Sequence, residues 1–194
     1  MLRDADIRDG LCDYLETKYG KICFFEELTM GKSRADIVMV TEQGLYGIEI
    51  KSDADTYERL SRQVRDYDRF FDYNYVVVGS SHAGHIEEHV PEYWGIITVE
   101  DDGGKLDCYD MRGAKRSPKV KLNNQMGLLW RSELALLQEQ NGLYKYSDKS
   151  KMYRKKYLIE SVDKKLLAKQ MLEVFLIEIT LYLRINNTNS KKAE

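Results

Sequence analysis

The sequence is poor in proline and histidine, and it has no long apolar run. Of 194 residues only two are proline and three are histidine, while 43% are hydrophobic. A chain of this composition is expected to bury a core and not to be disordered. The most apolar segment, 174–185, contains Glu178 and Arg184, and it is too short and too charged to span a bilayer.

The cysteine content and the net charge are also low. Cys12, Cys23 and Cys108 are far apart and form no CxxC pair, which indicates reduced thiols. The formal net charge is −2, so any nucleic-acid site must come from a local patch and not from the overall field. The N-terminus is charged and lacks the apolar core of a signal peptide. These features predict a cytoplasmic protein with no membrane partner.

Hydrophobic periodicity predicts an alternating series of helices and strands. A turn at 42–43 joins two strands into a hairpin, and Asp55 with Glu58 has the spacing of a capping box. The expected helices are 2–19, 55–71 and 123–140, with one or more further helices over 153–185, and the expected strands are 21–28, 35–40, 45–51, 75–80, 95–100 and 105–110. The β-branched run at 75–80 is typical of a central strand that is covered on both faces.

This order predicts an α/β fold with a mixed central β-sheet flanked by helices. Residues 1–122 would form this core, and residues 123–185 would form a C-terminal helical extension packed on it. The last residues, 186–194, are polar and are expected to be a flexible tail. The apolar C-terminal helices also offer a surface for a homodimer.

Two carboxylates and a lysine converge at the predicted hairpin. Glu49 and Lys51 lie two positions apart on one strand and therefore point the same way. A two-residue turn would place Asp36 opposite Glu49, with Cβ atoms about 4.5–5.5 Å apart, whereas a bulged turn would shift the pairing by one residue. Carboxylates held this close repel each other unless a cation lies between them.

Lysine and a divalent metal are the two candidates for that cation. In one interpretation Lys51 only bridges Asp36 and Glu49 at a sheet edge. In the other, the carboxylates hold Mg²⁺, which needs few protein ligands and retains waters, with Mn²⁺ able to substitute. The ion would polarise a phosphodiester and lower the pKa of a bound water. Lys51 would then orient that water or stabilise charge on the phosphate.

Asp36 followed thirteen residues later by Glu49-Ile50-Lys51 resembles the core of the PD-(D/E)XK nuclease superfamily, which has a restriction-endonuclease-like fold. Ala35 stands where the motif has proline. The segments EELTMGKSRADIVMV, GIEIKSDADTYERLSRQVRDYDRFFD, VVVGSSH, PEYWGII and LLWRSELALL together resemble a small bacterial and phage branch related to the VRR-type and MmcB-like groups. This resemblance runs to about Leu137. It implies a Mg²⁺-dependent nuclease that cleaves DNA, with Asp36 and Glu49 as metal ligands and Lys51 as the catalytic cation.

The resemblance also implies site residues outside the hairpin. A further acidic metal ligand is expected upstream, with Glu27 as the main candidate and Asp9 and Asp13 as rivals. Gln63 and Tyr67 are similar to the Q-x-x-x-Y element of several branches. Gln63 is expected to reach the metal-bound water or the substrate backbone, and Tyr67 either contacts nucleic acid or belongs to the core.

Local cations are the candidates for nucleic-acid contacts. Arg34 shares the face of Asp36, and it either contacts phosphate or neutralises nearby acids. Cations also cluster at 112–121 and 149–156, where they either follow a phosphate backbone or form a solvated face. In the second cluster the candidates are Lys151, Arg154 and Lys155.

Two other functions fit the same residues. One is a nuclease-like fold that binds DNA or a partner protein without cutting. The opposed acids argue against it, since a site that has lost its catalytic function has no reason to keep them. The other is a nuclease whose substrate is RNA.

Overall fold

The structure is a computed structural model that describes residues 4–52, 55–79 and 83–190, with the backbone alone described at 4–5 and 178–190. Residues 2, 3 and 80 of the expected elements lie outside this part. The chain divides into two compact units, Met1–Val120 and Lys121–Glu194. Among the described residues, no helix has the length and apolar character needed to cross a membrane.

A six-stranded mixed sheet forms the first unit, and its strand order follows the sequence. The first three strands and the last two are antiparallel neighbours, whereas β3, β4 and β5 are parallel. The strands are β1 (Cys23–Met30), β2 (Ser33–Thr41), β3 (Gly44–Lys51), β4 (Tyr73–Gly79), β5 (Gly95–Asp102) and β6 (Lys105–Arg112). The predicted α/β class, a mixed central sheet with flanking helices and a C-terminal helical segment, is confirmed.

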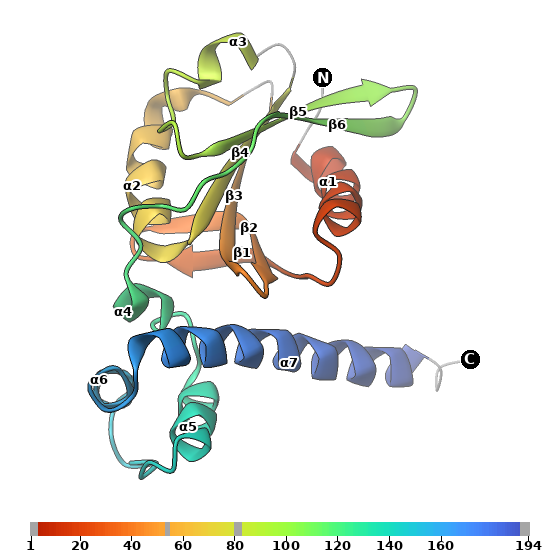
Figure 1. Ribbon diagram of the computed structural model, residues 1–194. Coiled ribbons are helices and arrows are strands. Elements are labelled where there is room, and N and C mark those ends of the chain that lie inside the picture. The colour runs from red at the N-terminus through yellow and green to blue at the C-terminus, as the bar shows by residue number, and fades with distance from the viewer. Residues whose placement is uncertain (1–3, 53–54, 80–82, 191–194) are drawn as a thin grey trace. The chain divides into compact units, whose positions relative to one another are not determined.

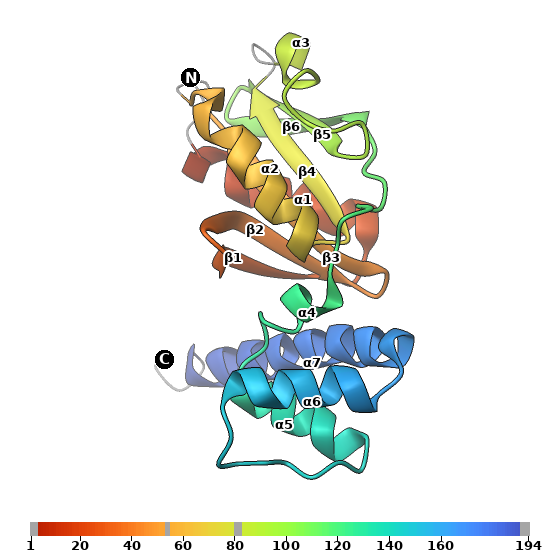
Figure 2. The same ribbon diagram turned by 90° about the vertical axis from the view of Figure 1, so that its left-hand side faces the viewer.

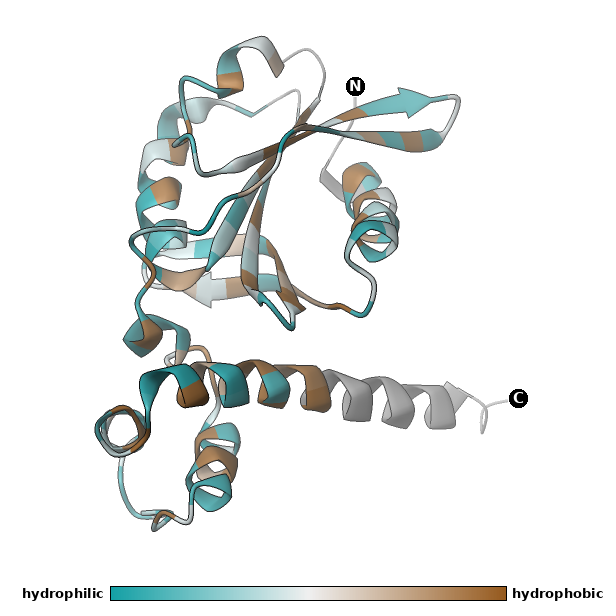
Figure 3. Ribbon diagram, viewed as in Figure 1, coloured by the Kyte–Doolittle hydropathy of each residue, from teal (hydrophilic) through white to brown (hydrophobic). Residues whose placement is uncertain are grey.

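Helices cover both faces of this sheet (Figures 1 and 2). One face is covered by α1 (Asp4–Tyr19) and the other by α2 (Leu60–Phe70), while the short α3 (Ala83–Ile86) follows β4. Because β3 and β4 are parallel, the chain must cross from one end of the sheet to the other, and α2 makes that crossing. The central strands are accordingly rich in hydrophobic residues (Figure 3).

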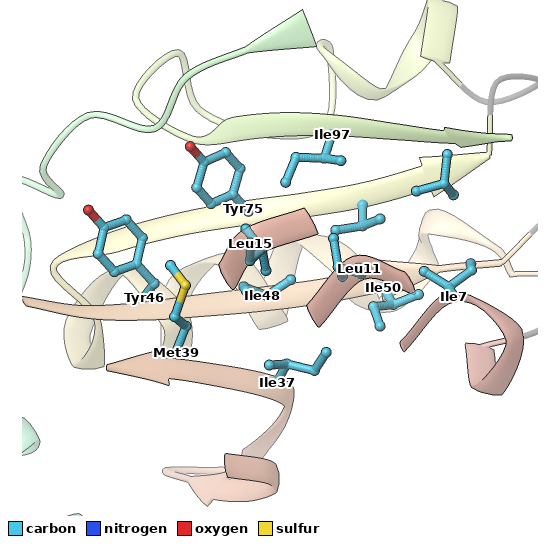
Figure 4. Close-up of a cluster of buried hydrophobic side chains, with 12 residues drawn as sticks. Ile7, Leu11, Leu15, Ile37, Met39, Tyr46, Ile48, Ile50, Tyr75 and Ile97 are labelled. Carbon is cyan, nitrogen blue, oxygen red and sulfur yellow. The ribbon is translucent and has the colours of Figure 1, made fainter. Parts of the chain in front are cut away.

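The core between α1 and the sheet fixes the direction of every side chain on β3. Ile7, Leu11 and Leu15 of α1 pack against a set of buried side chains from four strands (Figure 4). This set includes Tyr46, Ile48 and Ile50 of β3. Since side chains alternate along a strand, the odd-numbered residues of β3, including the two charged ones, face α2.

The register of the hairpin is the one that the sequence predicted. Thr41 pairs with Gly44, so the turn has two residues, and the ladder continues to Ile37 opposite Ile48. Asp36 and Glu49 are the next residues in this register. At this point Asp36 Oδ2 accepts the backbone N–H of Ile50 at 2.8 Å. The Asp36 carboxylate is thereby fixed at the end of the β2–β3 ladder.

The segment after β3 differs from its prediction. A 3₁₀ turn, η1 (Tyr57–Arg59), precedes α2, and the predicted capping box is wrong because Thr56 stands at the N-cap of η1. The Asp55 carboxylate instead accepts the N–H and the hydroxyl of Ser52, at 2.8 and 2.6 Å. Asp55 therefore bonds to the residue that follows β3 and does not begin a helix.

Four helices form the second unit. They are α4 (Leu122–Gln125), α5 (Arg131–Gln140), α6 (Lys151–Ser161) and α7 (Lys164–Ser190). The single helix expected at 123–140 is divided because the Glu133 carboxylate accepts the N–H of Trp130 and a new helix begins there. The helix expected to end at 185 continues to Ser190, so 186–190 are helical. Residues 191–194 lie outside the described part.

The cysteines are free thiols, as expected. Burial, followed by the negative field of nearby acids, raises the pKa of Cys12 and of Cys108 to about 11. Little thiolate therefore forms on either at neutral pH, so neither is suited to act as a nucleophile.

Gly47 allows α2 to lie close against β3. A Cβ atom at this position would lie 2.2 Å from Cδ2 of Phe71 and 2.6 Å from Cδ1 of Tyr67. Both rings are fully buried, so neither can move aside at low cost. This close approach brings the side chains of α2 to the charged residues of β3.

Replacing Gly47 by alanine should destabilise the protein by about 1–3 kcal/mol, because the added methyl group overpacks the contact between β3 and α2. Urea unfolding measures the loss. Gly113→Ala is the matched control, since no atom lies within 4 Å of the Cβ it would add. Equal effects of the two substitutions would contradict this account of the contact.

Candidate active site

Strand alternation brings four charged side chains to the α2 face at one end of the hairpin. Arg34 and Asp36 come from β2, and Glu49 and Lys51 come from β3. Together with Gln63 of α2, they line a cavity of about 550 Å³. The segment before α2 contributes the rest of its wall. The structure therefore brings together the predicted catalytic residues.

The Glu49 carboxylate is the centre of a buried hydrogen-bond network. Its Oε1 accepts Nζ of Lys51 at 2.6 Å and also Nε2 of Gln63, while its Oε2 accepts the hydroxyl of Tyr67 at 2.6 Å. Lys51 donates in addition to Oε1 of Gln63 at 3.2 Å. Glu49 is only 1% exposed. Burying an ion pair such as Glu49–Lys51 is tolerable only when the remaining polar atoms of the pair are hydrogen-bonded.

Tyr67 acts within the core and not at the surface. It is fully buried, so the prediction that it contacts nucleic acid is wrong and the core alternative is confirmed. Burial, together with the neighbouring carboxylates of Glu49 and Asp36, raises the pKa of Tyr67 well above its usual range. The phenol therefore stays protonated and remains a donor to Glu49, a role that the sequence alone did not indicate.

Two contacts to its main chain hold Asp36 in place. Its backbone N–H donates to the Tyr67 hydroxyl at 3.4 Å. Its carbonyl oxygen accepts the Arg8 guanidinium of α1 at 3.1 Å. The Tyr67 hydroxyl thus links the main chain of Asp36 to the carboxylate of Glu49. Arg8 was missed by the sequence analysis, although its position beside the buried Ile7 placed it at the edge of the α1 core.

Glu27 does not join the other two acids. Its backbone has φ 55°, which interrupts the alternation of side chains along β1. The carboxylate forms ion pairs with Arg8 at 2.6 Å and with Arg34 at 2.5 Å, and it does not line the cavity. The structure therefore does not support Glu27 as the third metal ligand, because two guanidinium groups already neutralise it.

Arg34 lies beside Asp36 at the cavity, as strand alternation predicts. It neutralises Glu27, and its side chain is also 65% exposed and lines the cavity beside Asp36. The ion pair with a nearby acid, one of the two alternatives for this residue, is therefore seen directly. The contact with phosphate stays a prediction.

Asp36 and Glu49 supply a small oxygen donor set that fits Mg²⁺. This ion is commonly held by one or two carboxylates and keeps several waters. In the part of the chain that is described, no group of three or more His, Cys, Asp or Glu side chains is placed to hold a metal. A closed cage of zinc or calcium type is not formed by these residues.

Residues 1–183 match the family described as bacteriophage P4 protein cII. The chain belongs to this family. No curated protein matches it. A solved structure of SfsA from Pyrococcus furiosus in complex with Ca²⁺ is similar at 12% identity and a TM-score of 0.34, over 58% of this chain and 61% of that chain. This likeness spans less than two thirds of the SfsA chain.

A phage family agrees with the phage branch that the sequence resembles. The PD-(D/E)XK assignment itself stays a prediction for this member of the bacteriophage P4 protein cII family. Its support comes from the positions of Asp36, Glu49 and Lys51.

Two of the cations expected at 149–156, Lys151 and Arg154, bond within the second unit. Lys151 donates to the carbonyl of Gly127 at 2.7 Å. Arg154 is 5% exposed, and it donates to the carbonyls of Tyr146 and Arg131 at 2.9 and 3.3 Å. The predicted phosphate contact of Arg154 is therefore wrong, because its guanidinium holds the helices of this unit together. Burial lowers the pKa of Lys155, whose role stays a prediction.

Replacing Tyr67 by phenylalanine should destabilise this cII-family protein by about 1–3 kcal/mol, because a buried oxygen of Glu49 loses its donor. Chemical denaturation at neutral pH measures the change. Tyr109→Phe removes a hydroxyl from a residue that is 71% exposed, and we expect it to change stability by less than about 0.5 kcal/mol. A Tyr67→Phe protein as stable as this control would show that the hydroxyl does not support Glu49.

Proposed function

We propose that this member of the bacteriophage P4 protein cII family is a Mg²⁺-dependent nuclease that hydrolyses DNA phosphodiester bonds. The observation that supports it best is the buried Glu49–Lys51 pair beside Asp36 on one wall of a polar cavity. We expect the enzyme to act in the cytoplasm. A homodimer formed through the C-terminal helices belongs to the same proposal.

The purely structural interpretation of Lys51 explains this arrangement less well. That interpretation required a bridge at a sheet edge, but β3 is an interior strand that pairs with both β2 and β4. Burying an ion pair costs several kcal/mol per ion in desolvation, and apolar residues of similar volume are often as stable. A charged pair kept inside the sheet is therefore better explained by chemistry at the cavity than by stability.

The proposed chemistry divides among four side chains. Asp36 and Glu49 would hold Mg²⁺, which when bound supplies the positive charge that polarises a phosphodiester and makes water more acidic. Lys51 offers a second positive charge to the phosphate oxygens as charge develops on them. Gln63 bonds both Glu49 and Lys51, so it orients the pair and is also placed to reach the substrate backbone.

A second candidate function is binding of DNA or a partner protein without cleavage. It is favoured by the state of Glu49, whose two oxygens already accept bonds from Lys51, Gln63 and Tyr67. Metal binding would have to share or displace one of these donors. The two functions therefore differ most clearly in metal uptake. A cleavage panel of duplex, single-stranded and branched DNA and of RNA would separate DNA from RNA as the substrate.

Replacing Asp36 by asparagine should reduce DNA cleavage at least about 100-fold, because one of two metal-binding carboxylates loses its charge. The rate of hydrolysis of labelled DNA in Mg²⁺ provides the measurement. Asp107→Asn makes the same chemical change at an exposed site on β6 and should leave the rate unchanged. If the Asp36→Asn protein keeps the wild-type rate, the proposed site is wrong.

Calorimetric titration with Mn²⁺ separates the two candidate functions. A nuclease should take up the ion in the wild-type protein, and Asp36→Asn should weaken that uptake at least about tenfold. At other sites, mutating a residue that only hydrogen-bonds to a metal ligand already lowers metal affinity by this much. The binding-only function instead predicts no uptake at this site in either protein. Loss of binding in the Asp107→Asn control would point to a different site.

A further inference from the structure

We propose that three arginines on the solvent face of α2 bind the phosphate backbone of a nucleic acid that enters the cavity. These residues are Arg62, Arg65 and Arg69. The inference deepens the proposed function. It rests on that function in one respect, which is that a nucleic acid approaches this cavity. Binding through this face can occur with or without cleavage, so the two ideas are tested separately.

The three arginines lie opposite the buried stripe of α2. Leu60, Val64, Tyr67 and Asp68 are the buried residues of this helix, whereas Arg62, Arg65 and Arg69 are all exposed. Residues seven apart lie on the same side of a helix after two turns, so Arg62 and Arg69 share one line, with Arg65 beside it. This line is about 10 Å long, at 1.5 Å per residue.

Both acids of α2, Asp66 and Asp68, bond to groups outside the helix. Asp66 accepts the hydroxyl of Ser33 at 2.6 Å. Asp68 is fully buried and accepts bonds from Tyr93, Trp94 and Lys119. No described residue forms an ion pair with Arg62 or Arg65. Glu58, four residues before Arg62, is the exposed acid nearest to them along the chain.

The arginine face is continuous with the cavity. Arg59 and Gln63 both line the cavity, and Arg62 is the neighbour of Gln63 in the first turn of α2. A strand whose phosphate lies near Asp36 and Lys51 can therefore continue along this helix. Successive phosphates of one strand rise 3.4 Å along the duplex axis, so a face of about 10 Å laid along that axis matches the rise of roughly three phosphates.

The positive charge of this face and its lack of exposed apolar side chains together indicate a nucleic acid as the partner. The large apolar side chains that are exposed in the described chain all lie outside α2, whereas the core of a protein interface is enriched in aromatic residues and depleted of charge. Arginine presents a planar set of donors that suits phosphate oxygens. The face therefore fits a polyphosphate backbone better than it fits a protein surface.

The test compares DNA binding by two triple variants with the same change in charge. The first is Arg62→Gln/Arg65→Gln/Arg69→Gln, and glutamine keeps a high helix propensity on this face. The control is Lys21→Gln/Lys105→Gln/Lys164→Gln, at exposed sites outside the two cation clusters at 112–121 and 149–156. Fluorescence anisotropy of a labelled 20-base-pair duplex in EDTA, over a range of salt concentrations, measures affinity without cleavage. Thermal unfolding checks that both proteins fold.

We expect the arginine variant to lose affinity on the order of 100-fold at 0.1 M salt, with the slope of log K against log [salt] reduced by about 2.7. The lysine variant should change little. Equal losses in the two variants, or tighter binding of polyglutamate than of DNA by the wild type, would overturn the inference. If the triple variant unfolds, Arg62→Gln/Arg65→Gln provides the same test with a slope reduced by about 1.8.

Cleavage assays keep this inference distinct from the proposed function. Binding lost in the arginine variant, while the wild type cuts nothing, would support the arginine face and contradict the nuclease. Wild-type cleavage with unchanged binding by the arginine variant would support the nuclease and contradict the arginine face. Single-stranded DNA and RNA of equal length show which backbone the face prefers.

Discussion

The contact between α2 and β3 is the constraint on which the site depends. Gly47 has no side chain, so the rings of Tyr67 and Phe71 lie directly against the strand. This closeness places the Tyr67 hydroxyl and the Gln63 amide within hydrogen-bonding distance of Glu49. Without these two donors, the buried carboxylate would be bonded to Lys51 alone. The geometry of the charged pair is therefore set by an uncharged contact two residues away on the strand.

The parts of the site that depend on local order were predictable from the sequence. The alternation of side chains in a strand is fixed by backbone geometry, so the common direction of Glu49 and Lys51 followed at once. The tight turn at 42–43 then set the register that leads to Asp36. The mixed sheet was also predicted, whereas the order of its strands was seen only in the structure, where each strand pairs with its neighbours in the sequence.

The parts that depend on contacts between distant segments were not predictable. Glu27 was expected at the metal site, but Arg8, nineteen residues earlier, binds it. Arg154 was expected at a surface, but carbonyl oxygens of Arg131 and Tyr146 accept its donors. The arginines of α2 were not among the expected nucleic-acid contacts, because their position next to the cavity depends on how α2 lies against β3.

The location of a divalent ion tests the central claim most directly. We expect a crystal grown with Mn²⁺ to show an anomalous scattering peak about 2–2.5 Å from carboxylate oxygens of both Asp36 and Glu49. Lys51 should remain beside the ion at the wall of the cavity. An ordered structure at high Mn²⁺ concentration with no peak between these carboxylates, and with the Glu49 network unchanged, would contradict the account.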